Sequence, residues 1–190
     1  VDFTERTEQL DEAQLAAAMA RFDDVAFDTV SALGGRVVKM IGDEVMFVSP
    51  TVESAAAICW RLIDLCEVDE ALTTLRAGFA SGPAVDLDGD VIGPAANLAH
   101  RLTSLAQPGT VLAPADLAPD PTGPPAADPG SGATDAGSAT GSRCVPLPGD
   151  TTGYLWRPMR TTRDIRGIGP VRLATVEPTR HLPAPASPLE

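Results

Sequence analysis

The stretch from residue 114 to residue 150 constrains the fold most strongly, because it cannot contribute to a packed core. Gly and Pro supply 14 of its 37 residues, mixed with Ala, Asp, Ser and Thr. Such a composition buries too little apolar surface to offset the entropy of ordering the chain. We therefore expect a disordered insertion at 114–150 in one domain, with its main part at 1–113, its closing strands at 151–178 and a flexible tail at 179–190.

The composition of the whole chain favours one folded domain. Of its 190 residues, 44% are hydrophobic and 21% are charged, which is enough apolar material for a core. The net charge of -12 repels the phosphate backbone of nucleic acids. No apolar run approaches the roughly 18 to 20 residues that a membrane helix needs, and no signal-peptide pattern opens the chain. We expect a cytoplasmic domain with neither a nucleic-acid nor a membrane partner.

Cysteine usage argues against a disulfide framework and against a structural zinc site. Cys59, Cys66 and Cys144 form no CxxC pair and have no histidines at zinc-ligand spacing. Cys59 and Cys66 fall on a predicted helix, where we interpret them as core residues.

Residues 36–48 predict a β-hairpin. Two β-rich runs, 36–41 and 44–48, flank the two-residue turn Gly42-Asp43. The prediction places the Asp43 carboxylate at the tip of the hairpin.

Helical periodicity predicts two helices around this hairpin, and start and stop signals predict a third. The first covers about 8–33 and can be capped by Thr4 or Thr7. The second opens at Thr51 or Ser49 and runs to about 68, and the third starts at Gly93-Pro94 and ends before Pro108-Gly109. Short strands are expected at 75–80 and 110–113, and 83–90 is interpreted as a turn into the third helix. This order of elements indicates a ferredoxin-like two-layer α/β sandwich, whose first strand would precede Val1.

Candidate site residues are ambiguous when each is taken alone. The common phosphate, dinucleotide, zinc-hydrolase and serine-hydrolase motifs are absent. Asp43 suits a magnesium ligand, but Asp is also a common turn residue. Asn97 and Arg101 share a helix face, where they can hold a ribose oxygen and a phosphate or form a solvated polar stripe. Lys39 faces away from Met40 and by itself is an ordinary surface lysine.

Three stretches taken together carry a family resemblance. They are Gly34-Gly-Arg-Val-Val-Lys-Met-Ile-Gly-Asp-Glu-Val-Met46, Leu75-Arg-Ala-Gly78 with Gly82, and Gly89-Asp-Val-Ile-Gly-Pro-Ala-Ala-Asn-Leu-Ala-His-Arg-Leu102. They resemble the catalytic domain of class III adenylate and guanylate cyclases of the actinobacterial type. The opening Val1-Asp-Phe-Thr4 is similar to the end of the family's first-strand motif, and 108–112 and 166–173 resemble its closing strands.

The resemblance implies a role for each matching residue. Lys39 and Asp90 occupy the purine-binding positions, and this pair implies adenine rather than guanine. Asp43 matches the second of two metal-binding aspartates. The remaining matches are Asn97 for the ribose, Arg101 for charge at the α-phosphate, Phe3 and Thr4 for the β- and γ-phosphates, and Arg166 as a substitute phosphate contact.

The implied activity is conversion of ATP to 3′,5′-cyclic AMP and pyrophosphate with two Mg²⁺ or Mn²⁺ ions per site. The family forms homodimers with shared sites, so that Lys39 and Asp43 of one chain would serve different sites. A regulatory domain can lie upstream in the same polypeptide. The first metal aspartate would fall ahead of Val1, so that the chain as given lacks one metal ligand and can be inactive by itself.

Two other hypotheses stay open at this point. One is a degenerate cyclase-like domain that binds nucleotide or regulates a partner without turnover. The other is an unrelated ferredoxin-like interaction domain, which has no reason to keep these residues at these spacings.

Overall fold

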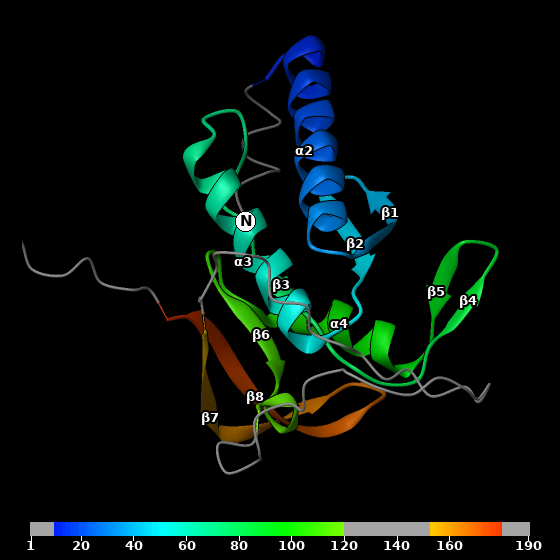
Figure 1. Cartoon of the computed structure of the whole chain (residues 1–190), viewed down its shortest axis with the longest axis vertical. Coiled ribbons are helices and arrows are strands. Elements are labelled where there is room, and N and C mark those ends of the chain that lie inside the picture. Colours follow the sequence, from blue (N-terminus) through cyan, green and yellow to red (C-terminus); the bar gives the residue numbers. More distant parts are fainter. Residues whose placement is uncertain (1–9, 120–152, 180–190) are drawn as a thin grey trace, which may run out of the picture.

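A computed structural model describes residues 10–119 and 153–179 of the chain (Figure 1). Phe3, Thr4, most of the predicted insertion and nearly all of the predicted tail lie outside the described residues. The described elements form helices packed on β-strands, as a two-layer α/β sandwich requires. None of the helices in these two ranges is long and apolar enough to cross a membrane.

The first helix, α2 (Glu12–Ala32), begins later than the sequence predicted. The expected start near residue 8 with Thr4 or Thr7 as cap is wrong, because Asp11 is the N-cap. The Asp11 carboxylate accepts a hydrogen bond from the Gln14 backbone N–H at 2.8 Å, and the Gln14 side chain accepts one from the Asp11 N–H at 3.0 Å. This reciprocal capping box satisfies two amide groups that the helix itself leaves free.

The second helix, α3 (Val52–Val68), confirms the predicted segment. Thr51 caps it by accepting a hydrogen bond from the Ser54 backbone N–H at 2.9 Å. One side of α3 contacts α2. On another side of α3, the Trp60 indole N–H donates to the Val176 carbonyl at 2.9 Å. This hydrogen bond fixes the helix on the four-stranded sheet that contains Val176.

The predicted hairpin is confirmed as β1 (Arg36–Ile41) and β2 (Glu44–Val48). Its apolar face packs against buried residues of α2 and α3 and comprises Val37, Met40, Val45 and Phe47. Gly42 has a φ of 62°, which glycine adopts at little cost in the turn.

The larger sheet has the order β3-β6-β8-β7. Its strands are β3 (Ala77–Gly78), β6 (Val111–Pro114), β8 (Gly169–Pro178) and β7 (Tyr154–Ile165). The strand expected at 75–80 is thus shorter. The strand expected at 110–113 extends to Pro114, which pairs with Leu173 and precedes the short helix η1 (Ala115–Leu117). Residues 114–119 therefore belong to the folded part, although the composition of 114–150 placed them in the insertion.

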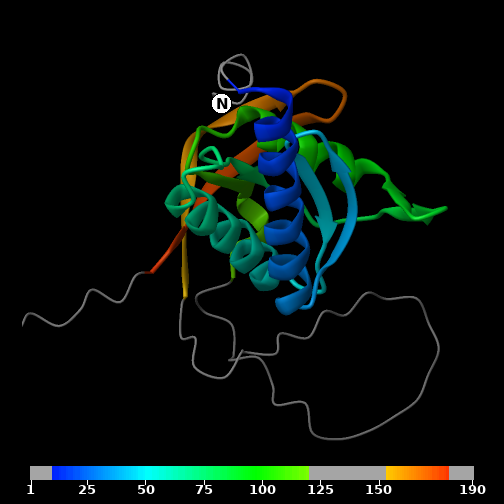
Figure 2. The same cartoon turned by 90° about the horizontal axis from the view of Figure 1, so that it is seen from above.

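A second hairpin replaces the turn that we expected at 83–90. It consists of β4 (Val85–Leu87) and β5 (Asp90–Ile92) and projects from the body of the molecule (Figures 1 and 2). Its loop residues Asp88 and Gly89 both have positive φ, 51° and 86°. Two successive residues of this kind are typical of the tight turn that matches the twist of a hairpin.

The third predicted helix is confirmed as α4 (Pro94–Leu105), with proline in its first turn. It packs directly on β3 because Gly78 has no side chain. A Cβ atom at Gly78 would lie 2.4 Å from the Thr103 backbone nitrogen. Leu102, on the same turn of α4, is completely buried.

The core supports the interpretation of the two helical cysteines. Cys59 and Cys66 are free thiols with exposed fractions of 2% and 1%. Burial raises the pKa of Cys59 to about 12 and that of Cys66 to about 11, so both stay neutral at ordinary pH. They act as small apolar residues in the core and are not suited to be nucleophiles.

Candidate active site

Lys39 and Asp90, which are 51 positions apart, are in direct contact. The Lys39 Nζ lies 2.7 Å from the Asp90 Oδ2 and forms an ion pair that joins β1 to β5. Their side chains are 40% and 43% exposed, so a ligand can reach both. The structure thus brings together the two residues that the sequence assigned to purine binding.

A β-bulge on β1 directs Lys39 away from the core. The register pairs Val37 with Phe47 and Lys39 with Met46, which leaves an extra residue between Val37 and Lys39. Because Phe47 and Met46 are neighbours on their strand, their partners lie on opposite faces of the hairpin. Val37 faces the core, and Lys39 therefore faces outward.

The Asp90 carboxylate is held at both oxygens. Oδ2 accepts from Lys39, and Oδ1 accepts from the Val91 backbone N–H at 2.8 Å. The hydrogen bond from Lys39, followed by that from Val91, lowers the pKa of Asp90 below its usual range. Asp90 is therefore an anionic acceptor at neutral pH, and its oxygens keep lone pairs free for a further donor.

Asp43 lies in the exposed turn between β1 and β2, as predicted. Its side chain lines a cavity of about 280 Å³ between β2 and β3, together with Arg76, Gly78 and Thr103. Strands β2 and β3 do not pair, so the β1–β2 hairpin and the larger sheet are separate. The cavity lies between these two strands. Asp43 also lines a smaller apolar pocket next to α2.

Asn97 and Arg101 lie one turn apart on α4, and both are exposed. Neither lines the cavity at Asp43. Among the described residues, no hydrogen bond or ion pair joins Asp43 to Asn97 or to Arg101. Within the described part of one chain, Asp43 is therefore not connected to Asn97 or Arg101.

Arg166 lies in the exposed turn between β7 and β8, and it does not line the cavity at Asp43. Figure 1 shows the β7–β8 hairpin at the lower end of the molecule, whereas α2 lies at its upper end. The predicted phosphate contact of Arg166 thus stays a prediction, as do those of Phe3 and Thr4, which are not described.

The metal-binding capacity of the described residues rests on Asp43. Its carboxylate is exposed and forms no ion pair with a described cation. Within 10–119 and 153–179, no group of three or more His, Cys, Asp or Glu side chains gathers as a metal cluster. Mg²⁺ takes only one or two protein carboxylates beside waters and substrate phosphates, so an exposed Asp43 fits part of such a site.

Sequence reasoning missed the hairpin that carries Asp90, and with it a second ion pair. The Arg36 guanidinium contacts the Asp86 carboxylate at 2.6 Å, again between β1 and the β4–β5 hairpin. The sequence signal was the dipeptide Asp88-Gly89 between Val-rich flanks, which is typical of a two-residue hairpin turn.

The sequence of the chain is similar to the sequences of several known proteins. No family model matches the chain. The chain is 39% identical over 112 residues to a protein of Streptomyces coelicolor named adenylate cyclase, which covers 59% of this chain and 29% of that protein. The chain thus spans less than a third of the length of the curated relatives it matches.

Solved structures extend the similarity to the fold. The catalytic core of a rhodopsin-guanylyl cyclase with converted specificity, in complex with ATPαS, superposes with a TM-score of 0.68 at 15% identity, covering 94% of this chain and 90% of that one. The adenylyl cyclase CyaB from P. aeruginosa gives a TM-score of 0.61 at 20% identity, with coverages of 94% and 90%. The resemblance expected from the sequence is confirmed: the chain is similar in sequence to proteins named adenylate cyclase, and it shares the fold of solved nucleotide cyclase domains.

Proposed function

We propose that this chain is the catalytic domain of an adenylate cyclase, which converts ATP to 3′,5′-cyclic AMP and pyrophosphate. The relatives named adenylate cyclase support this proposal. The observation that carries it is the contact of Lys39 with Asp90, which places one hydrogen-bond donor beside one acceptor at an accessible site.

Lys39 and Asp90 recognise adenine by its hydrogen-bonding edge. Adenine presents an acceptor at N1 and a donor at its exocyclic amine, so Lys39 donates to N1 and Asp90 accepts from the amine. The ion pair need not break, because Lys39 has three N–H groups and uses one of them on Asp90. Guanine reverses both groups and leaves Lys39 facing a donor and Asp90 facing an acceptor.

The remaining residues orient the ribose and the phosphates. Asp43 would hold Mg²⁺ or Mn²⁺. Two such ions per site, when bound, would lower the pKa of the ribose 3′-hydroxyl and neutralise charge on the leaving pyrophosphate. Asn97 orients the ribose for attack of its 3′-oxygen on the α-phosphorus. Arg101 stabilises the negative charge that develops at the α-phosphate.

A homodimer with shared sites fits the arrangement of these residues. Asp43 has no contact with Asn97 or Arg101 within the described part of one chain, so a second copy would supply the missing half of each site. Exposed apolar residues of the β4–β5 hairpin, Val85 at 60%, Leu87 at 55% and Ile92 at 48%, offer surface for such an association.

The test of base recognition replaces both proposed purine-binding residues in the full-length natural protein. Lys39→Glu combined with Asp90→Ser should lower the ratio of kcat/KM for ATP over GTP at least about tenfold, because each polar group that the bound base covers and leaves unpaired costs about 1–3 kcal/mol. Arg157→Gln, which breaks an exposed ion pair with Glu177 on the larger sheet, is the matched control and should leave the ratio unchanged.

Two outcomes would contradict the proposal. An unchanged ATP to GTP ratio in the double variant would mean that Lys39 and Asp90 do not contact the base. ATP binding by the full-length protein without formation of cyclic AMP, with either Mg²⁺ or Mn²⁺ present, would favour the alternative of a nucleotide-binding regulatory domain.

Complementation tests the shared site. Asp43→Ala and Arg101→Ala proteins should each be nearly inactive, whereas a mixture should regain activity through one intact site per heterodimer. Failure to regain activity, with dimers confirmed by sedimentation, would contradict the shared-site arrangement.

A further inference from the structure

Two ion pairs join strand β1 to the β4–β5 hairpin. Arg36 contacts Asp86 at 2.6 Å, and Lys39 contacts Asp90 at 2.7 Å. We propose that Arg36 and Asp86 form a positioning pair, which holds the hairpin so that Asp90 faces Lys39 and thereby sets the selectivity for the base. The inference rests on the proposed function for its effect on selectivity.

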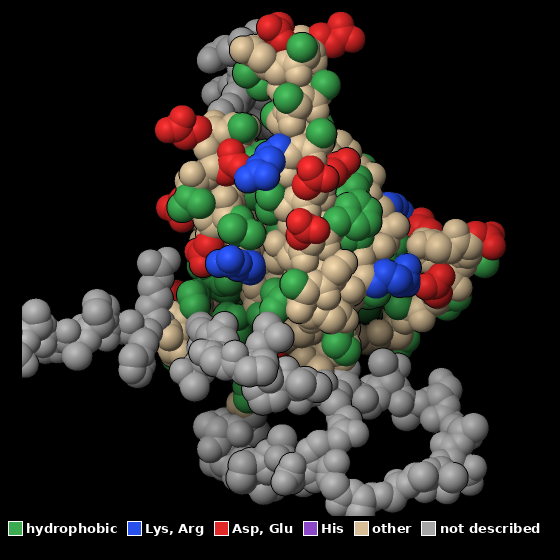
Figure 3. Space-filling view, turned by 45° about the horizontal axis from the view of Figure 1, so that its top comes forward, with side chains coloured by type: hydrophobic (Ala, Val, Ile, Leu, Met, Phe, Trp, Pro, Cys, Tyr) green, Lys and Arg blue, Asp and Glu red, His purple; other side chains and the backbone are tan. Residues whose placement is uncertain are grey.

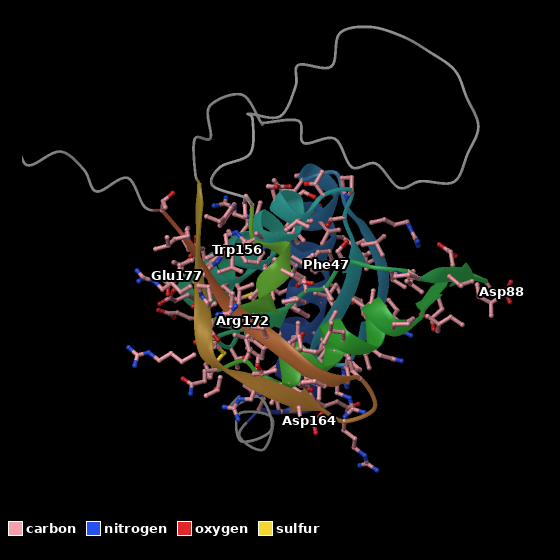
Figure 4. The ribbon with its side chains drawn as sticks, turned by 90° about the horizontal axis from the view of Figure 1, so that it is seen from below. Phe47, Asp88, Trp156, Asp164, Arg172 and Glu177 are labelled. Atoms are coloured by element: carbon pink, nitrogen blue, oxygen red, sulfur yellow. The ribbon has the colours of Figure 1, made fainter. Side chains whose placement is uncertain are left out.

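The β4–β5 hairpin depends on polar attachments because it has almost no core of its own. Val91, at 8% exposure, is its only buried residue among 85–92. Figure 4 shows Asp88 at the far tip of the hairpin, well away from the body. In Figure 3, positively and negatively charged side chains lie next to each other at the base of this projection.

The base of the hairpin is narrow. Gly93, which follows β5 and caps α4, has a φ of 145°, and a Cβ there would lie 2.9 Å from the Pro83 carbonyl oxygen. The two chain segments at the base therefore run close together without side chains between them. Such a narrow base leaves the direction of the hairpin to contacts farther along it.

The bulge on β1 places both basic residues on one face. Strict alternation would put residues three positions apart on opposite faces of a strand. The extra residue between Val37 and Lys39 shifts the alternation by one, so that Arg36 and Lys39 both face away from the core. Arg36 and Lys39 thus provide two attachment points that lie up to about 10 Å apart along β1.

Two separated attachment points restrain an element that one point would leave free to turn. Asp86 pairs in register with Val91, the residue that follows Asp90 and donates to its carboxylate. A hairpin held at Lys39–Asp90 alone can pivot about that contact. The Arg36–Asp86 pair opposes this rotation from the other strand of the hairpin and keeps the Asp90 oxygens in a fixed direction.

The effect is expected in selectivity and local order, and not in overall stability. Arg36 and Asp86 are 50% and 55% exposed, and such surface pairs contribute little to the free energy of unfolding. Arg36 and Asp86 are also not among the residues proposed to contact substrate. Their loss should raise the KM for ATP and lower the ATP to GTP ratio of kcat/KM about threefold to tenfold, with little change in the melting temperature.

The experiment compares Arg36→Gln, Asp86→Asn and the reversed pair Arg36→Asp with Asp86→Arg in the full-length natural protein. Both single variants should lose selectivity, and the reversed pair should recover most of it. Arg157→Gln is the matched control, since its pair with Glu177 has a similar exposure, 61% and 44%. A structural role unrelated to the hairpin would not be rescued by charge reversal.

A second measurement does not require catalysis. Hydrogen exchange of amides 85–92 in this 190-residue chain should become about threefold to tenfold faster in Arg36→Gln and should return toward the wild-type rate in the reversed pair. Unchanged exchange in Arg36→Gln would overturn the inference. Wild-type protein that forms no cyclic AMP, together with faster exchange in Arg36→Gln, would refute the proposed function and leave the positioning role supported.

Discussion

The two hairpins that form the proposed purine-binding contact are stabilised in different ways. Each has a two-residue turn that contains glycine, and each contributes one residue to the Lys39–Asp90 pair. The β1–β2 hairpin packs one whole face on α2 and α3. The β4–β5 hairpin buries Val91 and leaves Val85 and Leu87 mostly exposed.

This difference determines how firmly each of the two residues, Lys39 and Asp90, is positioned. Close packing fixes a hairpin with a full apolar face, because any shift opens a void in the core. A hairpin without that face takes its direction from a few polar contacts, which open at low cost. We therefore regard Lys39 as the rigid partner of the pair and Asp90 as the adjustable one.

The largest effect should come from the core beneath the first hairpin. Ile58 is fully buried in the cluster that contacts β1 and β2, and Ile58→Ala should lower the free energy of unfolding by about 2–5 kcal/mol. Leu87→Ala on the second hairpin, where the residue is 55% exposed, should change it by no more than about 0.5 kcal/mol. Denaturant unfolding measures both, and equal losses would remove the distinction between the hairpins.

Alanine substitutions at the two turn glycines should have different effects, one on global stability and the other on local stability. Gly42 and Gly89 have φ values of 62° and 86°, so alanine at either position costs roughly 1 kcal/mol of backbone strain. Gly42→Ala should lower the midpoint of denaturant unfolding. Gly89→Ala should mainly accelerate hydrogen exchange at 85–92, because that hairpin can open without unfolding the core. A similar drop in midpoint for both variants would argue that the second hairpin unfolds together with the core.

A smaller effect is expected from pH at the contact of the two hairpins. The folded state lowers the pKa of Asp90, so its stabilising contribution is present above the ordinary aspartate pKa of about 3.9 and is lost as pH falls through the folded value. The Asp90 carboxylate should therefore stay ionised near pH 4, as followed by NMR titration. In Lys39→Met, the pKa of Asp90 should move back up toward its usual range. A pKa that did not respond to this substitution would mean that the ion pair is not formed in solution.

The smallest effect should come from shortening the segment that belongs to neither hairpin. Replacing residues 120–150 by a brief Gly/Ser linker should change the melting temperature little, because its composition cannot bury a core and the entropy of loop closure varies slowly with length. Residues 114–119 must be kept, since Pro114 pairs with Leu173 in the larger sheet. A large drop in melting temperature would show that the segment packs against the domain.

Much of the local structure could be predicted because its signals are local. The spacing of apolar residues predicted α3, Gly93-Pro94 predicted the start of α4, and Gly42-Asp43 between two β-rich runs predicted the first hairpin. The start of α2 was misplaced because several residues could cap it, and the choice of Asp11 depends on the side chain of Gln14. The β4–β5 hairpin was missed because its strands are only three residues long.

The sequence by itself determined the family resemblance, the helices and the residue types available to a nucleotide site, because each depends on motifs or on periodicity along the chain. Only the tertiary structure decided which of those residues meet. Lys39 reaches Asp90 because a bulge on β1 turns the Lys39 side chain outward and because the distant β4–β5 hairpin lies beside β1, and no local pattern specifies that the two meet. Contacts between residues 51 positions apart depend on packing and register across the whole domain, which local preferences do not specify.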